Sequence, residues 1–422
     1  MKFEMPCGTT SVSLELPDSV RHISTHAAPA LPDPQAAVAR ALASPIGTPP
    51  LAEIARDRKN ACIVISDITR PVPNHVILPP ILQTLEAGGM ATGDITILIA
   101  TGMHRPNLGA ELESMVGPEI MEKYRIVNHY CRKKEELRAI AIIDGAPIEV
   151  NTHYLDADLK ILTGLIEPHF YAGFSGGRKS ILPGISSFET MTFMHSYQVI
   201  NQLHKANCRL ENNIFHQYAM EVTRKAGVDF IVNVVINKDR ELTGVFAGHY
   251  DKAHRAGCEM VVAHAVSDLD RPADLVITSA GGYPLDATFY QVSKCLISAK
   301  DILKEDGTIL VLCGCQEGLG GEEFCTIMRS NPTPADFTTR HSDPKNFVID
   351  QWCAQNIYQS LEHAGKIYIF SPGLSSEDVS RFSGIKVEDC QATVNELLRT
   401  HKDVVVIPEG PYVVGKVRNQ EV

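Results

Sequence analysis

Short apolar segments rich in Ile, Val and Leu alternate with stretches of helical periodicity along most of the 422-residue chain. The clearest of these segments are Cys62–Ile65, Ile95–Ala100, Leu159–Ile166, Phe230–Ile236, Asp274–Thr278, Thr308–Leu312, Lys366–Phe370 and Val404–Ile407. Nearly continuous apolar strands are typical of parallel sheets that are covered on both faces. The pattern therefore predicts an α/β protein with mostly parallel sheets flanked by helices.

The polar segment Ser267–Pro272 ends in proline directly before a predicted strand, and is therefore the preferred linker. It divides the chain into an N-terminal α/β domain of residues 1–268 and a C-terminal α/β domain of residues 273–422. Both lengths are usual for domains with a core of their own.

Composition limits the choice of compartment and partner. Hydrophobic residues make up 44% of the chain and charged residues 21%, as in ordinary soluble proteins. The net charge of −11 argues against nucleic acid or an anionic membrane as main partner, while local cations still allow a small anionic substrate. Eleven scattered cysteines without a C-x-x-C pair, and the lack of a signal peptide or long apolar run, favour reduced thiols in a cytoplasm.

Residues 167–184, Glu-Pro-His-Phe-Tyr-Ala-Gly-Phe-Ser-Gly-Gly-Arg-Lys-Ser-Ile-Leu-Pro-Gly, bring His169, Lys179 and several glycines into one short loop. Glycines permit positive φ and can turn several N–H groups toward one anion. Arg178 and Lys179 add cations, and a lysine can also carry a covalent cofactor bond. The segment is typical of a binding and reaction loop, with a tight surface connection as the structural alternative.

A nucleotide P-loop is the competing interpretation of this loop. Gly173, Lys179 and Ser180 have the spacing of G-x-x-x-x-G-K-[ST], but Arg178 stands where the motif requires glycine. A P-loop must also open a helix, and Pro183 follows too soon for that. The sequence therefore excludes a P-loop.

Other polar residues also follow predicted strand ends, where open α/β sheets bind ligands. Asp67 and Arg70 follow the first strand, and His104 follows the second. Asp67 and Arg70 could form a local ion pair, or Arg70 could present a bidentate fork to a carboxylate or phosphate. His104 taken alone is more often structural than catalytic.

A predicted helix after the strand Asp274–Thr278 carries Tyr290, Gln291 and Lys294 at i, i+1 and i+4. These side chains could line one binding face, or the face could simply be solvated. His195 fits a capping histidine, a core histidine or a metal ligand equally well.

Taken together, these motifs resemble the nickel-dependent lactate racemase family, the 2-hydroxyacid racemases and epimerases that use a nickel-pincer nucleotide. The matching pieces, in family order over about two thirds of the chain, are Ser66-Asp67-Ile68-Thr69-Arg70-Pro71, Thr101-Gly102-Met103-His104-Arg105-Pro106, Glu167 through Gly184, His195, and Tyr290-Gln291 with Lys294. The resemblance implies a cytoplasmic two-domain α/β isomerase with its site in the cleft between domains.

The resemblance also implies roles for single residues. Lys179 would hold the cofactor, pyridinium-3-thioamide-5-thiocarboxylic acid mononucleotide with nickel, through a thioamide in the loop that contains Gly176 and Gly177. His195 would complete the nickel coordination beside two sulfurs and a carbon of the cofactor. His104 and His169 would be the paired acid and base. Four residues would hold the substrate carboxylate or the cofactor phosphate: Arg70, Tyr290, Gln291 and Lys294. Asp67 would help to orient that anion site, and the division of these five residues between substrate and phosphate is left open.

The implied reaction inverts the α-carbon of a 2-hydroxy acid by hydride transfer to the cofactor and back. Lactate, malate, longer hydroxy acids and aldonic acids all fit the same core. Cofactor-biosynthesis proteins would be maturation partners. Two other classes remain open: a metal-dependent lyase or hydrolase without the covalent cofactor, and a non-catalytic binder of small anions.

Overall fold

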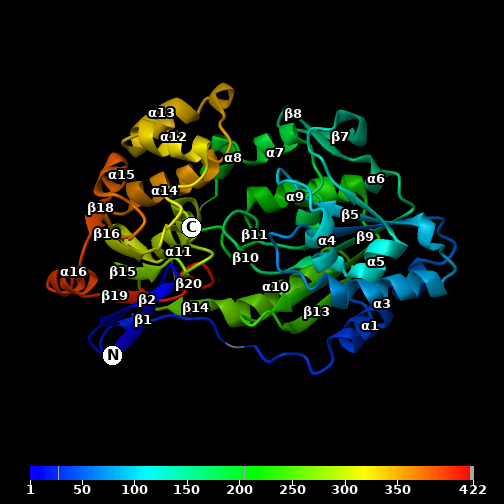
Figure 1. Ribbon diagram of the computed structural model, residues 1–422, viewed down its shortest axis with the longest axis horizontal. Coiled ribbons are helices and arrows are strands. Elements are labelled where there is room, and N and C mark those ends of the chain that lie inside the picture. The colour runs from blue at the N-terminus through cyan, green and yellow to red at the C-terminus, as the bar shows by residue number, and fades with distance from the viewer. Residues whose placement is uncertain (27, 204, 419–422) are drawn as a thin grey trace. The chain divides into compact units, whose positions relative to one another are not determined.

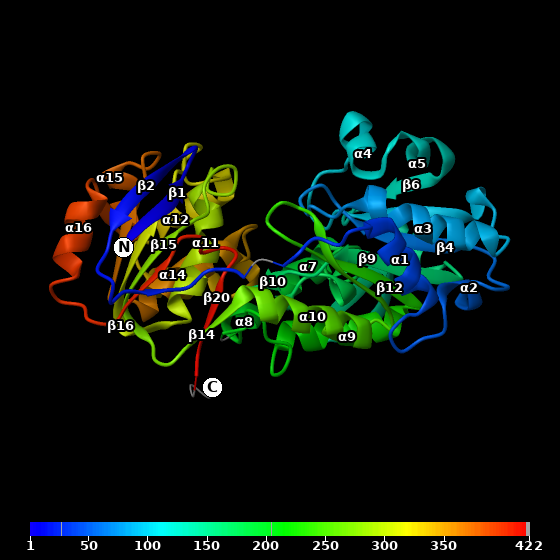
Figure 2. The same ribbon diagram turned by 90° about the horizontal axis from the view of Figure 1, so that it is seen from below.

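The structure, a computed structural model, describes residues 1–26, 28–203 and 205–418 (Figures 1 and 2). The chain divides into two units, each formed by more than one segment. One unit comprises Ala27–Met194 and Cys208–His264 and is called the Lys179 unit below. The other comprises Met1–His26, His195–Asn207 and Ala265–Val422 and is called the Tyr290 unit.

A six-stranded sheet forms the centre of the Lys179 unit, with the strand order β13-β12-β9-β4-β5-β6. Its strands are β4 (Ala61–Ser66), β5 (Ile95–Ala100), β6 (Arg125–Asn128), β9 (Leu159–Leu165), β12 (Phe230–Ile236) and β13 (Leu242–Gly248). All neighbours are parallel except the antiparallel edge strand β13. The apolar runs predicted to be strands in this half of the chain are therefore confirmed as parallel neighbours.

Helices cover both faces of this sheet. The helices of the unit are α1 (Pro34–Ala43), α2 (Leu51–Ile54), α3 (Asn74–Ala87), α4 (Gly109–Val116), α5 (Pro118–Lys123), α6 (Thr152–Leu155), α7 (Phe188–Met194), α9 (Ile214–Ala226) and α10 (Lys252–Ala265). The first five pack with alternate residues of the strands into one buried cluster. Figure 2 shows α9 and α10 on the side of the strands opposite to α1 and α3. This covering explains why the strands read as nearly continuous apolar runs.

Two small hairpins stand beside this sheet. β7 (Leu137–Ile143) pairs with β8 (Ala146–Asn151), and β10 (Pro168–His169) pairs with β11 (Gly173–Phe174). The second hairpin leads into a short 3₁₀ helix, η3 (Gly177–Ser180), rather than an α-helix. This local structure agrees with the exclusion of a P-loop.

The Tyr290 unit is built on a second six-stranded sheet, with the order β18-β17-β16-β15-β19-β3 and parallel neighbours throughout. Its strands are β3 (Arg21–His22), β15 (Ala273–Ser279), β16 (Leu303–Leu312), β17 (Lys366–Phe370), β18 (Ile385–Val387) and β19 (Val404–Ile407). The predicted strands Lys366–Phe370 and Val404–Ile407 are confirmed residue for residue.

One face of this second sheet is covered by the hairpin of β1 (Lys2–Cys7) and β2 (Thr10–Glu15) together with α16 (Cys390–Leu397). Figure 1 shows α11, α12 and α14 on the other side of the strands from β1 and β2. The remaining helices of the unit are α8 (Tyr197–Asn201), α11 (Phe289–Lys300), α12 (Glu322–Ser330), α13 (Pro334–His341), α14 (Gln351–His363) and α15 (Ser376–Arg381).

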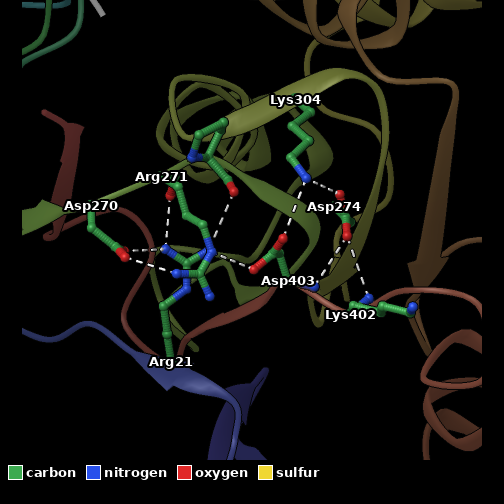
Figure 3. Close-up of polar contacts among 8 residues, drawn as sticks. Arg21, Asp270, Arg271, Asp274, Lys304, Lys402 and Asp403 are labelled. Atoms are coloured by element: carbon green, nitrogen blue, oxygen red, sulfur yellow. Dashed lines mark hydrogen bonds and ion pairs between the residues drawn. The ribbon is translucent and has the colours of Figure 1, made fainter. Parts of the chain in front are cut away.

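The unit boundaries differ from the division at residue 268, because the first residues of the chain pack with the C-terminal sheet. Met5 and Leu14 of the β1–β2 hairpin are fully buried in the core of the Tyr290 unit. Arg21 on β3 donates to the carboxylate of Asp270 at 3.2 Å and to the carbonyl of Arg271 at 2.7 Å (Figure 3). These contacts place β3 at the edge of the second sheet.

The segment Ser267–Pro272 was predicted to be a linker, and its first half is instead a strand. Helix α10 runs directly into β14 (Val266–Leu269), which pairs in parallel with β20 (Val414–Val417). The β14–β20 pair is separate from the six-stranded sheet, so its polar side chains can face solvent. This exposure explains the polar sequence that suggested a linker. No helix in the described ranges is long and apolar enough to cross a membrane.

Candidate functional site

Three neighbouring strands of the Lys179 unit, β9, β4 and β5, deliver most of the predicted site residues from their carboxyl ends. The chain runs from β4 outward to β5 and β6, then returns to place β9 on the other side of β4. The strand order therefore reverses between β4 and β9, which is where open α/β sheets form ligand-binding crevices. Asp67 and Arg70 follow β4, and His169 and Lys179 follow β9.

Asp67 pairs with His104 across this edge of the sheet. Oδ2 of the Asp67 carboxylate lies 2.7 Å from Nδ1 of His104, and Oδ1 accepts from the Thr69 hydroxyl at 2.7 Å. The carboxylate side chain is 6% exposed, whereas the imidazole is 57% exposed. A buried carboxylate that holds one nitrogen of a more exposed imidazole is the arrangement that orients a catalytic histidine.

Arg70 pairs with Glu167 rather than with Asp67. Nε of Arg70 lies 3.7 Å from Oε1 of Glu167, and both side chains are 38% exposed. At this distance and exposure the pair is a loose ion pair with little stabilising effect. The local Asp67–Arg70 ion pair that the sequence allowed is not among the ion pairs of the described residues.

His169 is held from the side of Nδ1. The backbone N–H groups of Tyr171 and Ala172 both donate to this nitrogen, at 3.1 and 3.2 Å. His169 also pairs with Gly173 in the β10–β11 hairpin. The loop therefore fixes both the position of this imidazole and the role of one of its nitrogens.

The glycines of the loop allow close packing against the protein itself. A Cβ on Gly173 would lie 2.1 Å from the carbonyl oxygen of Arg209, and one on Gly177 would lie 2.8 Å from the His254 ring. The N–H of Gly177 donates to the side-chain oxygen of Asn233 at 2.8 Å. This N–H is thus engaged within the fold.

Arg178 and Lys179 have different environments although they are adjacent. Arg178 is 1% exposed, donates to the carbonyl of Ala172, and lies 2.8 Å from Nε2 of His254, which also lies 2.9 Å from the Ser175 carbonyl oxygen. Burial lowers the Arg178 pKa to about 10, and burial, followed by the Arg178 charge, holds the His254 pKa well below its ordinary value. Arg178 therefore supports the loop from inside, and the expectation that it lies beside a bound anion is not met. Lys179 is only partly buried.

In the Tyr290 unit, helix α11 confirms the predicted spacing of Tyr290, Gln291 and Lys294. Burial holds the pKa of the Tyr290 phenol far above its ordinary value, so this group is neutral. The side-chain oxygen of Gln291 is buried and has no hydrogen-bond partner among the described residues. A buried acceptor of this kind is suited to a donor group on a ligand.

His195 belongs to the same unit and lies against Trp352, with ring centroids 4.9 Å apart. The Trp352 indole in turn donates to the Tyr290 hydroxyl at 3.3 Å. Trp352 thus connects two of the predicted site residues, and sequence reasoning missed it. Its being the only tryptophan of the chain was the one available signal.

Across residues 1–26, 28–203 and 205–418, no group of three His, Cys, Asp or Glu side chains could hold a metal ion. His195 as a single imidazole donor suits nickel when other ligands come from a cofactor. The amine of Lys179 suits covalent attachment.

Comparison with known proteins gives matches over most of the chain. Sequence profiles of the lactate racemase N-terminal and C-terminal domains match residues 7–207 and 269–414. The lactate racemase of Thermoanaerobacterium thermosaccharolyticum is 34% identical over 421 residues, which covers 97% of this chain and 98% of that protein. The lactate racemase of Lactiplantibacillus plantarum is 37% identical over 339 residues, or 79% of each chain.

Solved structures give the same correspondence. The lactate racemase apoprotein from Thermoanaerobacterium thermosaccharolyticum has a TM-score of 0.89 at 34% identity, covering 99% of this chain and 100% of that one. A Thermotoga maritima protein has a TM-score of 0.64 at 18% identity, covering 92% of this chain and 99% of that one, and shows a likeness in fold alone.

Proposed function

Because the chain belongs to the lactate racemase family, we propose that it interconverts the two enantiomers of lactate with a nickel-pincer nucleotide bound covalently to Lys179. Family membership makes the chain an isomerase of the racemase class. The observation that supports the catalytic proposal best is the Asp67–His104 pair at the same sheet edge that carries His169 and Lys179.

Hydride transfer is the chemistry that the residue types favour. Removing the α-proton of a 2-hydroxy carboxylate would build a second negative charge beside the carboxylate, at high cost. The bound cofactor would supply a hydride acceptor that avoids this charge. The protein then has to bind the carboxylate, orient the α-carbon and move the hydroxyl proton.

His104 and His169 are the proposed proton-transfer residues, one for each enantiomer. In the proposal, the His104 imidazole takes the hydroxyl proton at Nε2, and Asp67 stabilises the imidazolium that forms. Imidazole is a suitable group for a reaction that runs in both directions, because its unperturbed pKa lies near neutrality.

The substrate carboxylate requires cationic partners, and Arg70 is the first candidate. Its Glu167 partner is loose enough to be displaced by a bidentate carboxylate. Tyr290, Gln291 and Lys294 are proposed to hold the substrate or the cofactor phosphate, and Gly176 and Gly177 to shape the cofactor-binding loop. His195 is proposed as the nickel ligand from the protein.

The proposal extends to larger 2-hydroxy acids such as malate or an aldonate, which share the carboxylate and hydroxyl that the site would bind. It also includes maturation by cofactor-biosynthesis proteins and a cytoplasmic location.

The test is a chiral assay on protein produced together with the cofactor-biosynthesis proteins. We expect either enantiomer of lactate to reach an equal mixture with the parent protein, and no conversion with Lys179→Ala, which should keep its fold by circular dichroism. Full activity in Lys179→Ala would refute the covalent assignment. Activity that needs only an added divalent metal would favour the lyase or hydrolase class, and ligand binding unaffected by His104→Ala and His169→Ala would favour a non-catalytic binder.

A further inference from the structure

We infer that the structure holds the two proposed proton-transfer histidines in opposite tautomers. His104 carries its proton on Nδ1 and presents Nε2 as a proton acceptor, whereas His169 carries its proton on Nε2 and presents it as a donor. The catalytic meaning of this difference rests on the proposed function. The tautomers themselves follow from the contacts alone.

The tautomer of His104 is set by Asp67. An ionised carboxylate has only acceptor oxygens, so the nitrogen 2.7 Å from Oδ2 has to be the N–H donor. The second carboxylate oxygen already accepts from the Thr69 hydroxyl, which fixes the orientation of the carboxylate. In the neutral ring the lone pair then lies on Nε2.

The tautomer of His169 is set by the backbone. The N–H groups of Tyr171 and Ala172 can only donate, and both meet at Nδ1, so this nitrogen has to be an acceptor. Turning the ring over would place a C–H against two amide donors and leave both without an acceptor. The neutral ring therefore carries its proton on Nε2, and a proton on Nδ1 is excluded while these hydrogen bonds last.

The same turn occurs at a second histidine of this chain that no proposed step uses. His249 accepts at Nδ1 from the N–H groups of Asp251 and Lys252, at 3.2 and 3.4 Å. The same pair of hydrogen bonds, from the second and third backbone N–H groups after the histidine to its Nδ1, thus occurs again at the start of α10. His249 provides an internal reference for the tautomer expected of His169.

The opposite tautomers give the two histidines different hydrogen-bonding roles before the substrate binds. A substrate hydroxyl can pass its proton to Nε2 of His104: the O–H bond breaks, an N–H bond forms, and the O–H electron pair becomes the second bond between carbon and oxygen. The α-hydrogen would leave as hydride, with the C–H electron pair, to the acceptor that the proposed cofactor would supply. Nε2–H of His169 meanwhile donates a hydrogen bond to a substrate oxygen. For His169 to accept a proton at Nε2, or to give one to a substrate oxygen and remain a neutral imidazole, it has to carry a proton on Nδ1, so both amide hydrogen bonds have to break.

The direct test is ¹⁵N NMR of the full-length chain with labelled histidine, recorded at neutral pH without cofactor and assigned with His104→Gln, His169→Gln and His249→Gln. We expect a protonated Nδ1 for His104 and a protonated Nε2 for His169 and His249. In Asp67→Asn, the Asn amide can donate to Nδ1, so the His104 proton should move to Nε2. Racemisation by the loaded Asp67→Asn variant should fall by about 10²–10⁴-fold.

A His169 signal with a proton on Nδ1, or a doubly protonated His169, would overturn the inference even if the enzyme racemises lactate. The expected tautomers without any racemisation by loaded protein would instead contradict the proposed function and leave the tautomer assignment standing. The two failures are therefore distinguishable.

Discussion

Gly173 is the position where the loop that carries His169 and Lys179 is most sensitive to a single methyl group. Its φ is +77°, and a Cβ there would lie 2.1 Å from the carbonyl oxygen of Arg209 and 2.8 Å from its carbonyl carbon. The N–H of Cys208 also donates to the Gly173 carbonyl at 3.0 Å, so the two backbones are already joined. Neither can move aside as a flexible side chain could.

The expected cost of Gly173→Ala has two parts. A left-handed backbone costs a non-glycine residue about 1–2 kcal/mol. The overlap with Arg209 adds the cost of an overpacked contact, about 1–3 kcal/mol. The local free energy of opening should therefore fall by about 2–5 kcal/mol.

Gly145 provides a matched control, because its φ is +80° and a Cβ there would meet nothing within 4 Å. Gly145→Ala should lose only the conformational part, about 1–2 kcal/mol. Hydrogen exchange measured by mass spectrometry gives the local opening free energy of each loop. We expect faster exchange by about 30-fold to several thousand-fold in the β10–β11 hairpin of Gly173→Ala, and by about 5-fold to 30-fold in the β7–β8 turn of Gly145→Ala. Equal acceleration in the two loops would refute the argument from close approach.

Three further predictions concern buried polar groups. Burial lowers the His129 pKa from 6.5 to about 4, so between these pH values the unfolded chain binds a proton at this histidine and the folded chain does not. The free energy of unfolding should therefore fall by about 3 kcal/mol as the pH drops from 6.5 to about 4. The urea midpoint of His129→Gln should depend less on pH there, and an unchanged dependence would contradict this. Arg178→Met should leave the Ala172 carbonyl without its donor and reduce adduct formation on Lys179, measured by intact mass; full loading would show that the loop does not need the guanidinium. The backbone N–H groups of Gly8 and Gly314 donate to the Asp286 carboxylate at 2.8 and 2.7 Å. Asp286→Asn should weaken these hydrogen bonds and lower the midpoint temperature of thermal unfolding, and an unchanged midpoint would contradict this.

The parallel sheets were predictable because their strands are buried on both faces and so lack polar interruptions. Strands with one exposed face were missed, because alternation over a few residues is a weak signal. β2 is an example, with only Leu14 buried in a run of Thr, Ser and Glu. β3 is shorter still, and it is held at its sheet edge by contacts between residues distant in sequence, which no local pattern shows.

At the site, the sequence located the loops but not the directions of their side chains. Arg178 and Lys179 are adjacent cations, and only the fold shows that Arg178 is buried against His254. The glycines suggested an anion-binding loop, and the fold shows in addition that Gly173 and Gly177 allow close contact with the protein's own atoms. The Asp67–His104 pair joins loops 37 residues apart and needed the adjacency of β4 and β5 to be seen.

The most direct test of the proposed function is intact-protein mass spectrometry with metal analysis, on protein from a host that makes the nickel-pincer nucleotide. We predict a covalent adduct that maps to Lys179, with nickel near one ion per chain. An unmodified chain without nickel, in a host that loads a known family member under the same conditions, would contradict it.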